Sequence, residues 1–481
     1  MSRPVLDRWQ FRISPDAEEG ARPLGRWFLA SQPDLPVTEV RDAEGRGAGV
    51  LLGFPIDLGT RRMDGATWTA PGTLGADVDG FAAEVLDALG GLFVWVFVTE
   101  SVARIYPDAS AQVPVVFDPA DGIVGSTAHA LFDDAEYDAR FDRAAYDRLG
   151  VDGEGWFPAG LTAHRGLERL LPNHVLDLET WTAARVPSTV VGRVSEEPDA
   201  IVDEIIDVLA AQVEALVEGD KRPAFALTGG HETRVLLSLA RPWLDRVDFV
   251  TVTGAGRHQM DSILAGRIAA DLGLNHILLP RLEGSPEEAA RFIRRGGHCN
   301  ADSNARFHPS VRPIAESHVF VGGLGGEFAR AFFWRDGDTD ETPLTSDLLT
   351  GRFGLPRTEI LTERLDRWLR EVPQVGTLQK LDLAYVEHRN GAWASVQFCS
   401  DPTLVRQAPL ITRRTADLMM QLPPEWKRGN RLGAAIIARL WPELDRYPYN
   451  TLGPWRDRWI KLQRVLENPR VIVKKLRKMR A

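Results

Sequence analysis

A turn of threonine and glycine follows the apolar run at 224–227 (AFAL) and precedes the helix-forming run at 232–240 (ETRVLLSLA). The residues of this first turn that could contact a ligand are Thr228, Gly229, Gly230, Glu232, Thr233 and Arg234. Glycines remove side chains where the backbone must approach a ligand, and N–H groups at the start of a helix attract phosphate. Glu232 would repel a bare phosphate, so it suits a Mg2+ ion that accompanies the phosphates. Arg234 is interpreted either as a further phosphate contact or as a partner of Glu232.

The same order of residues recurs at 318–328 (HVFVGGLGGEF), where glycines precede Glu327. The glycines of this second turn that could approach a nucleotide are Gly323, Gly325 and Gly326. If both turns end strands of one parallel sheet, Glu232 and Glu327 would lie on either side of a shared metal ion. Asp261, between the two turns in sequence, is predicted to start a helix after another strand end. Glycine-rich helix starts with ordinary N-terminal acidic residues would explain the same patterns without a ligand.

The elements around both turns predict an α/β fold. From about residue 195, apolar strand-like runs alternate with amphipathic helices, which is typical of a parallel sheet covered on both faces. Residues 1–190 contain short strands and turns instead, with helices predicted at 76–89 and 136–149, and so favour an α+β layered domain. The last third is predicted to be helical.

The composition fits an enzyme of the cytoplasm. Among the 481 residues, 44% are hydrophobic and 26% charged, and no run of about 18 apolar residues or secretory signal is present. The two cysteines, Cys299 and Cys399, cannot form a disulfide framework and favour a reducing compartment. The net charge of −10 argues against nucleic acid as the main partner.

The C-terminal stretch 456–481 departs from this overall charge. It carries ten Lys or Arg against Asp457 and Glu467, with apolar residues at helical spacing. Such a basic amphipathic tail suits an anionic membrane surface or a partner protein, which would place the chain peripherally at a membrane. Docking of the tail on the acidic body of the same chain explains the pattern equally well.

From about 195 to 450 the sequence resembles the asparagine synthetase family, whose synthetase domain is an ATP pyrophosphatase of the PP-loop type. The family's first turn reads Ser-Gly-Gly-x-Asp-Ser, and residues 228–233 here read TGGHET. Its second, Gly-x-Gly-x-Asp-Glu-like turn corresponds to GLGGE at 323–327, and Asp261 lies where the family has its middle acidic residue. The resemblance implies that ATP and Mg2+ are cofactors and that Glu232 and Glu327 are metal ligands.

The first half is similar, more weakly, to the N-terminal-nucleophile (Ntn) glutaminase domain of full family members. That glutaminase needs a cysteine directly after the initiator Met, whereas Ser2 stands here. The resemblance therefore implies a degenerate glutaminase-like (Ntn) sandwich domain at 1–190, a PP-loop ATP-binding domain with a helical C-terminal part at 195–455, and the tail. This is the pattern of the β-lactam synthetase and lasso peptide cyclase branches, which use an amine already on the substrate.

The β-lactam-forming branches use a Tyr and Glu pair to remove the amine proton. On the helix predicted at 381–397, Tyr385 and Arg389 share a face while Glu387 points elsewhere, so Tyr385 with Arg389 is favoured as the catalytic pair. The family also places a lysine near its C-terminal helices, for which Lys427 and Arg431 are candidates. A buried helix and a solvated basic loop would explain these four residues without catalysis.

The function that the resemblance implies is an ATP-dependent, AMP-forming amide-bond ligase in specialised or cell-envelope metabolism. It would adenylate a carboxylate substrate and couple it to an amine acceptor, such as a peptide. An intramolecular cyclase of the lasso or β-lactam type and an intermolecular ligase are both open. Because both metal ligands are Glu where the family has Asp, a non-catalytic scaffold is the competing hypothesis.

Overall fold

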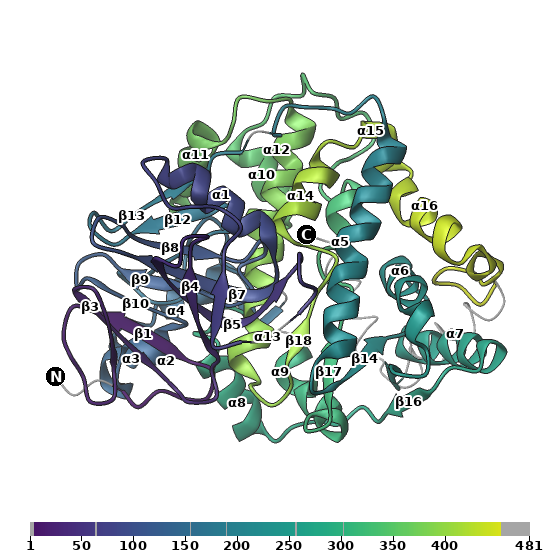
Figure 1. Cartoon of the computed structure of the whole chain (residues 1–481), viewed down its shortest axis with the longest axis horizontal. Coiled ribbons are helices and arrows are strands. Elements are labelled where there is room, and N and C mark those ends of the chain that lie inside the picture. The colour runs from purple at the N-terminus through teal and green to yellow at the C-terminus, as the bar shows by residue number, and fades with distance from the viewer. Residues whose placement is uncertain are drawn as a thin grey trace.

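The N-terminal half is a sandwich of two β-sheets, drawn in purple and blue in Figure 1. The computed structural model describes residues 4–62, 65–153, 155–188, 190–254, 257–301 and 303–453. One sheet is antiparallel, in the order β11 (Glu168–Arg169), β9 (Val116–Asp118), β10 (Ile123–Gly125), β1 (Phe11–Ser14), β3 (Trp27–Ser31) and β2 (Arg22–Leu24). The other is antiparallel except between its last two strands, in the order β13 (Thr182–Arg185), β12 (His174–Asp177), β8 (Ala103–Pro107), β7 (Leu89–Val98), β5 (Gly47–Asp57), β4 (Val37–Arg41) and β6 (Thr67–Thr69).

The alternation of apolar residues along β7 explains the layering. Residues on one face of a strand recur every second position. Leu92, Val94 and Val96 enter the core between the two sheets. The alternate residues Phe93, Trp95 and Phe97 pack under helix α1 (Val78–Ala88), which covers the outer face. The predicted α+β layering of this half is therefore present, whereas its likeness to an Ntn hydrolase stays a prediction.

The prediction of a single helix at 136–149 is wrong. The structure has α3 (Asp134–Arg140) and α4 (Arg143–Arg148), which follow the short α2 (Ala128–Leu131). The break arises because Asp142 accepts a hydrogen bond from the N–H of Ala145 and so caps a new helix.

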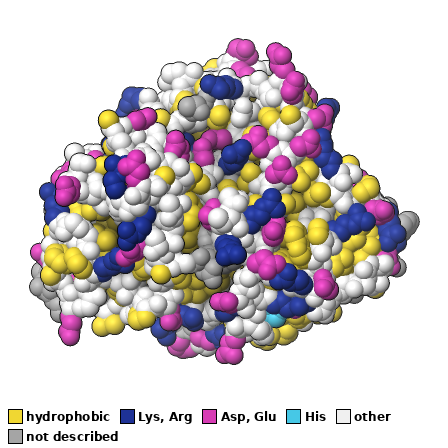
Figure 2. All heavy atoms as spheres, in the orientation of Figure 1, with side chains coloured by type: hydrophobic (Ala, Val, Ile, Leu, Met, Phe, Trp, Pro, Cys, Tyr) yellow, Lys and Arg dark blue, Asp and Glu magenta, His cyan; other side chains and the backbone are white. Residues whose placement is uncertain are grey.

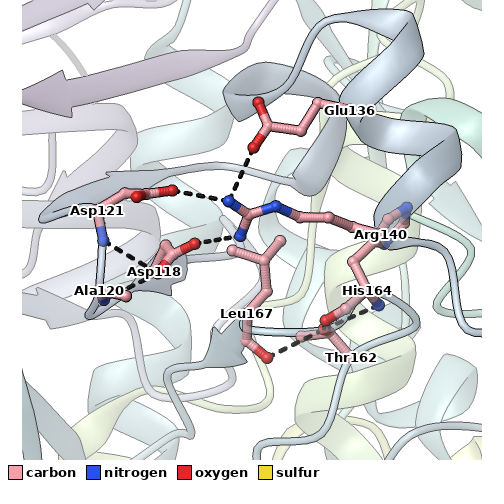
Figure 3. A network of polar contacts seen from close by, with 8 residues as sticks. All are labelled: Asp118, Ala120, Asp121, Glu136, Arg140, Thr162, His164 and Leu167. Carbon is pink, nitrogen blue, oxygen red and sulfur yellow. Dashed lines mark hydrogen bonds and ion pairs between the residues drawn. The ribbon is translucent and has the colours of Figure 1, made fainter.

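Arg140, at the end of α3, ties this helix to the β9–β10 turn (Figure 3). Its guanidinium forms ion pairs with Asp118, Asp121 and Glu136. Asp118 also accepts hydrogen bonds from the N–H groups of Ala120 and Asp121. The turn at 117–126 is thus held by Asp118 and by Arg140 from α3.

The C-terminal half contains the predicted parallel sheet. Its five strands are all parallel, in the order β16 (His276–Leu279), β15 (Asp248–Val252), β14 (Arg222–Ala226), β17 (His318–Val321) and β18 (Arg406–Gln407). The helices that alternate with the strands are α5 (Pro198–Glu218), α6 (His231–Ala240), α7 (Arg257–Leu272), α8 (Pro286–Arg295) and α9 (Ser303–Phe307). Buried apolar residues lie on both faces of the sheet, in two separate clusters. The sequence prediction of an α/β half is confirmed. In the structure β14 and β17 are hydrogen-bonded neighbours.

The last third is helical, as predicted, and packs against the N-terminal sandwich. Its helices are α10 (Ser346–Phe353), α11 (Glu359–Glu371), α12 (Thr377–Ala384), α13 (Gly391–Ser400), α14 (Arg413–Met420), α15 (Pro424–Arg428) and α16 (Arg431–Leu440). A π-helical turn, Tyr385–Asn390, joins α12 to α13. The rings of Trp9 and Phe398 stack 5.3 Å apart, so α13 lies against the sandwich.

Two features of the sequence fall outside the described residues, namely Ser2 and the basic tail at 456–481. Within the described ranges, no helix is both long and apolar enough to cross a bilayer. Figure 2 shows acidic and basic side chains interspersed over one face of the molecule.

Candidate active site

The first turn, between β14 and α6, is stabilised by hydrogen bonds among its own residues. The hydroxyls of Thr228 and Thr233 lie 2.9 Å apart, and the N–H of Gly230 donates to the Thr228 hydroxyl at 3.0 Å. The N–H of Gly229 donates to Asp261 Oδ1 at 3.0 Å. These two N–H groups therefore bond to the protein itself in this conformation. The start of α6 has no side-chain cap, so its first N–H groups are the part of the turn suited to an anion.

Asp261 acts on the turn from a neighbouring helix. It lies in the second turn of α7, not at the helix start as predicted, and its side chain is buried. Its hydrogen bond from Gly229 makes it a positioning residue for the first turn.

The second turn, after β17, approaches the first closely. Glu232 crosses it, since a Cβ atom on Gly323 would lie 2.6 Å from the Glu232 Cβ and one on Gly326 would lie 2.5 Å from its Cγ. Gly325 has φ of +88°, a conformation that L side chains rarely adopt. Gly323 and Gly326 thus allow the Glu232 side chain of one turn to pack against the backbone of the other, and Gly325 allows the turn its left-handed conformation. This convergence is the arrangement that the order of the strands predicts.

Arg330 lies between the two carboxylates. Its Nη2 is 2.5 Å from Glu232 Oε1 and 3.7 Å from Glu327 Oε1. Burial, and then the neighbouring charge of Glu232, raise the pKa of Glu327. Sequence reasoning missed Arg330, although it follows Glu327 by three positions on the same short helical turn, Gly326–Arg330.

Tyr385 completes the cluster from the π-helical turn. Its hydroxyl donates to Glu327 Oε2 at 3.1 Å, and its ring lies 4.8 Å from the ring of Phe332. Burial, together with the charge of Glu327, raises the pKa of Tyr385 well above its ordinary value. Tyr385 is therefore protonated at neutral pH. π-Helical turns within α-helices occur frequently at functional sites.

The other residues predicted on this helix lie on different sides. The guanidinium carbon of Arg389 lies 4.2 Å from the ring centroids of both Trp156 and Trp393. The positive charge of Arg389 acts on Tyr385 and lowers its pKa, against the larger effect of burial. Glu387 points away from Tyr385 and is buried in an ion pair with Arg185. The charge of Arg389 thus reaches Tyr385, but the catalytic pairing of these two residues stays a prediction.

Arg234 does not pair with Glu232, contrary to one interpretation of the sequence, and its role as a phosphate contact stays a prediction. Its side chain is buried and donates to the carbonyls of Tyr447 at 2.7 Å and Pro448 at 3.0 Å. It also lies 3.8 Å from the ring centroid of Tyr449, which stacks on His231 at 4.0 Å. Arg234 therefore anchors the segment 447–450 over the first turn.

The two candidates near the C-terminal helices occupy different environments. Lys427 is buried, and its Nζ donates to Asp382 Oδ2 at 2.6 Å. Its Nζ lies 5.7 Å from the ring centroid of Phe328, and Phe328 follows Glu327 directly in the sequence. A buried amine already paired with a carboxylate is a structural ion pair in this conformation. Arg431 is exposed at the first position of α16.

The donor set is compatible with Mg2+ bound together with phosphate. Mg2+ usually takes one or two protein carboxylates plus phosphate oxygens, and Glu232 and Glu327 supply two. Among the described residues no cluster of three His, Cys, Asp or Glu side chains offers a metal a complete protein cage. Glu232 Oε1 is buried and lacks a well-aligned hydrogen bond even though Arg330 is close. The two carboxylates would therefore hold a metal ion only together with ligands from another molecule.

Comparison with known proteins gives limited similarity. No protein-family model and no curated protein matches the sequence. Among solved structures, the chain is 12% identical to the U34-tRNA thiolase of Methanococcus maripaludis, with 42% of this chain and 78% of that chain covered and a TM-score of 0.20. It is 13% identical to the NH3-dependent NAD synthetase of Campylobacter jejuni, with 41% and 96% covered and a TM-score of 0.20. It is 12% identical to the glutamine-dependent NAD+ synthetase of Acinetobacter baumannii, with 45% and 40% covered and a TM-score of 0.19. Similarity at this level carries no statement about what this chain does.

Proposed function

We propose that this chain is an ATP-dependent, AMP-forming amide-bond ligase that couples a carboxylate to an amine. The observation that carries the proposal is the convergence of Glu232 and Glu327 from turns that follow two adjacent parallel strands. Ligands of parallel sheets bind at this edge, where the strands end. The resemblance of the two turns to those of asparagine synthetases supports the same assignment.

The chemistry explains why the site would need both a nucleotide and charge neutralisation. A carboxylate is a poor acyl donor because hydroxide is a poor leaving group. In the proposed reaction a carboxylate oxygen of the substrate attacks the α-phosphorus of ATP, and pyrophosphate leaves. The amine then attacks the acyl carbon, and AMP leaves as the amide forms. Mg2+ held by Glu232 and Glu327 would offset the negative charge on the phosphates, and the uncapped start of α6 would bind the pyrophosphate.

The amine must lose a proton, and Tyr385 with Glu327 offers a route for it. The protonated hydroxyl of Tyr385 already donates to Glu327. As the amine attacks, its proton would pass to the Tyr385 oxygen while the Tyr385 proton passes to the Glu327 carboxylate. This transfer belongs to the second step, after pyrophosphate and Mg2+ would have left, when the raised pKa of the metal-free Glu327 makes its carboxylate a better proton acceptor.

The acyl and amine partners are proposed by class. Phe332, 43% exposed beside Tyr385, provides an apolar wall for the acyl group. The amine would come from the substrate itself or from a second molecule such as a peptide, which keeps both the cyclase and the intermolecular ligase open. The tail at 456–481 would bind an anionic membrane surface or a partner protein.

A second candidate, a non-catalytic scaffold, is favoured by one observation. Arg330 contacts both carboxylates, so their charges are partly neutralised without a metal ion. A former synthetase that no longer turns over ATP would tolerate such an arrangement.

Pyrophosphate release separates the two candidates. Purified protein is given ATP, Mg2+, a pool of carboxylates and hydroxylamine as a generic amine. The ligase releases pyrophosphate and AMP in equal amounts and forms a hydroxamate, only when a carboxylate is present, and Glu327→Ala abolishes all three. Bound ATP without pyrophosphate release under any condition would establish the scaffold instead.

A further inference from the structure

The position of Arg330 between Glu232 and Glu327 has a consequence for metal binding. We infer that Arg330 is an internal counter-cation that keeps free divalent metal ions out of the site, so that metal enters only together with a nucleotide. The inference rests on the proposed function, since it assumes that these carboxylates meet a metal–nucleotide complex. It assigns to Arg330 the role of a positioning residue that sets the order of binding.

The contacts of Arg330 overlap with those that a metal ion would make. Nη2 of its guanidinium lies 2.5 Å from Glu232 Oε1 and 3.7 Å from Glu327 Oε1. The guanidinium therefore occupies the space between the two candidate metal ligands. A metal ion and the guanidinium would repel each other there, so binding of one displaces the other. Because the arginine is attached to the same chain, it competes without any cost of association.

The same contacts show how a nucleotide would release the metal site. The Arg330 side chain is 32% exposed, and Glu232 Oε1 has no well-aligned hydrogen bond from it, so the ion pair is close but imperfect. Phosphate can accept two parallel hydrogen bonds from one arginine. It is therefore a better partner for Arg330 than one misaligned carboxylate oxygen. A nucleotide would therefore attract Arg330 away from the carboxylates and supply the metal with phosphate oxygens at once.

Mn2+ binding tests the inference without requiring activity. Free Mn2+ is measured by electron paramagnetic resonance in titrations of the full-length chain, with and without a non-hydrolysable ATP analogue, and the Mn2+ that the analogue binds in protein-free solution is subtracted. Wild-type protein should bind Mn2+ weakly alone and tightly with the analogue. Arg330→Met, which keeps the length of the side chain but removes the charge, should bind Mn2+ alone at least about tenfold more tightly than wild type.

A matched control is available in α16. Arg439 also bridges two carboxylates, Asp199 and Asp203, at 2.7 and 2.8 Å, and is 29% exposed. Arg439→Met should leave Mn2+ binding unchanged, because Asp199 and Asp203 are 76% and 66% exposed and solvent screens their charges, whereas Glu232 and Glu327 are largely buried. Adding Glu232→Gln to Arg330→Met should remove the gain, because it removes one of the two ligands that the arginine protects.

The outcomes distinguish this inference from the proposed function. Equal Mn2+ affinity of Arg330→Met and wild type would overturn the inference, as would wild-type protein that binds Mn2+ equally well with and without the analogue. The second criterion holds even if the Arg330→Met variant does not fold. Wild-type protein that binds Mn2+ as expected but releases no pyrophosphate overturns the ligase proposal alone.

Discussion

Glu327 is the residue on which the contacts of the site converge. It accepts a hydrogen bond from Tyr385, lies near Arg330, and has its pKa raised by burial and by the charge of Glu232. Because the Tyr385 pKa is raised well above its ordinary value, the tyrosine is protonated at neutral pH. In the proposed reaction the pair would therefore move a proton rather than present a tyrosinate.

Tyr385→Phe tests this role. The change removes one hydrogen bond to a charged group, which is worth roughly 1.5–3 kcal/mol, so we expect the rate of hydroxamate formation to fall by roughly 10- to 100-fold, while pyrophosphate is still released in the first turnover. Tyr146→Phe is the control, because Tyr146 donates to Asp152 at 2.7 Å outside the site. A similar loss in both variants would show that only folding is affected, and an unchanged rate in Tyr385→Phe would contradict the proton route.

At the scale of elements, the sequence predicts the sheet but not what lies over it. The alternation of apolar strands and amphipathic helices predicts the parallel sheet, and the glycines mark both turns at strand ends. Local sequence patterns cannot show which segment, distant in sequence, packs over a turn. Tyr449 lies more than two hundred positions after Arg234 yet packs on its guanidinium, so an arginine predicted as a ligand contact also acts as an anchor. The sequence analysis did not predict Arg330 as a site residue, because it considered only the glycines and carboxylates of the two turns.

Arg234→Met tests the anchor. Loss of two buried hydrogen bonds and a cation–π contact should lower the free energy of unfolding by about 2–4 kcal/mol. It should also speed hydrogen exchange at 447–453 and weaken ATP binding. Arg241→Met is a matched control, since Arg241 is exposed, donates to the Leu440 carbonyl and stacks on Trp441. Unchanged exchange at 447–453 in Arg234→Met would contradict the anchoring role.

Across the whole molecule, a buried ion pair joins the sandwich to the helical third. Glu387 accepts hydrogen bonds from Arg185 in β13 and, at 2.6 Å, from Trp368 in α11. Burial raises the pKa of Glu387, but the charge and hydrogen bonds of Arg185 more than offset this, and the pKa falls to about 2. The π-helical turn that carries Tyr385 is thus fixed to the sandwich two residues further on, so the sandwich supports the position of Tyr385.

The pH dependence of stability tests this connection. The folded pKa of Glu387 lies below the unfolded value of 4.5, so its contribution of roughly 3 kcal/mol is present above about pH 4.5 and is lost as the pH falls toward 2. Urea unfolding should show Glu387→Gln much less stable than wild type at pH 7, with the difference shrinking at pH 3.5. Glu204→Gln, which breaks an exposed pair with Arg414, should have little effect at either pH. A pH-independent difference for Glu387→Gln would refute the charge-based connection.

The central claim is that the two glycine turns form one nucleotide site, and carboxylate-dependent exchange of labelled pyrophosphate into ATP tests it most directly. The rate is measured for wild type, Glu232→Gln, Glu327→Gln and the double variant. If both carboxylates act on one bound metal–nucleotide complex, each single change should reduce exchange at least about 100-fold and the double change should cost little more. Exchange that survives both changes, or two losses that simply add, would contradict a shared site.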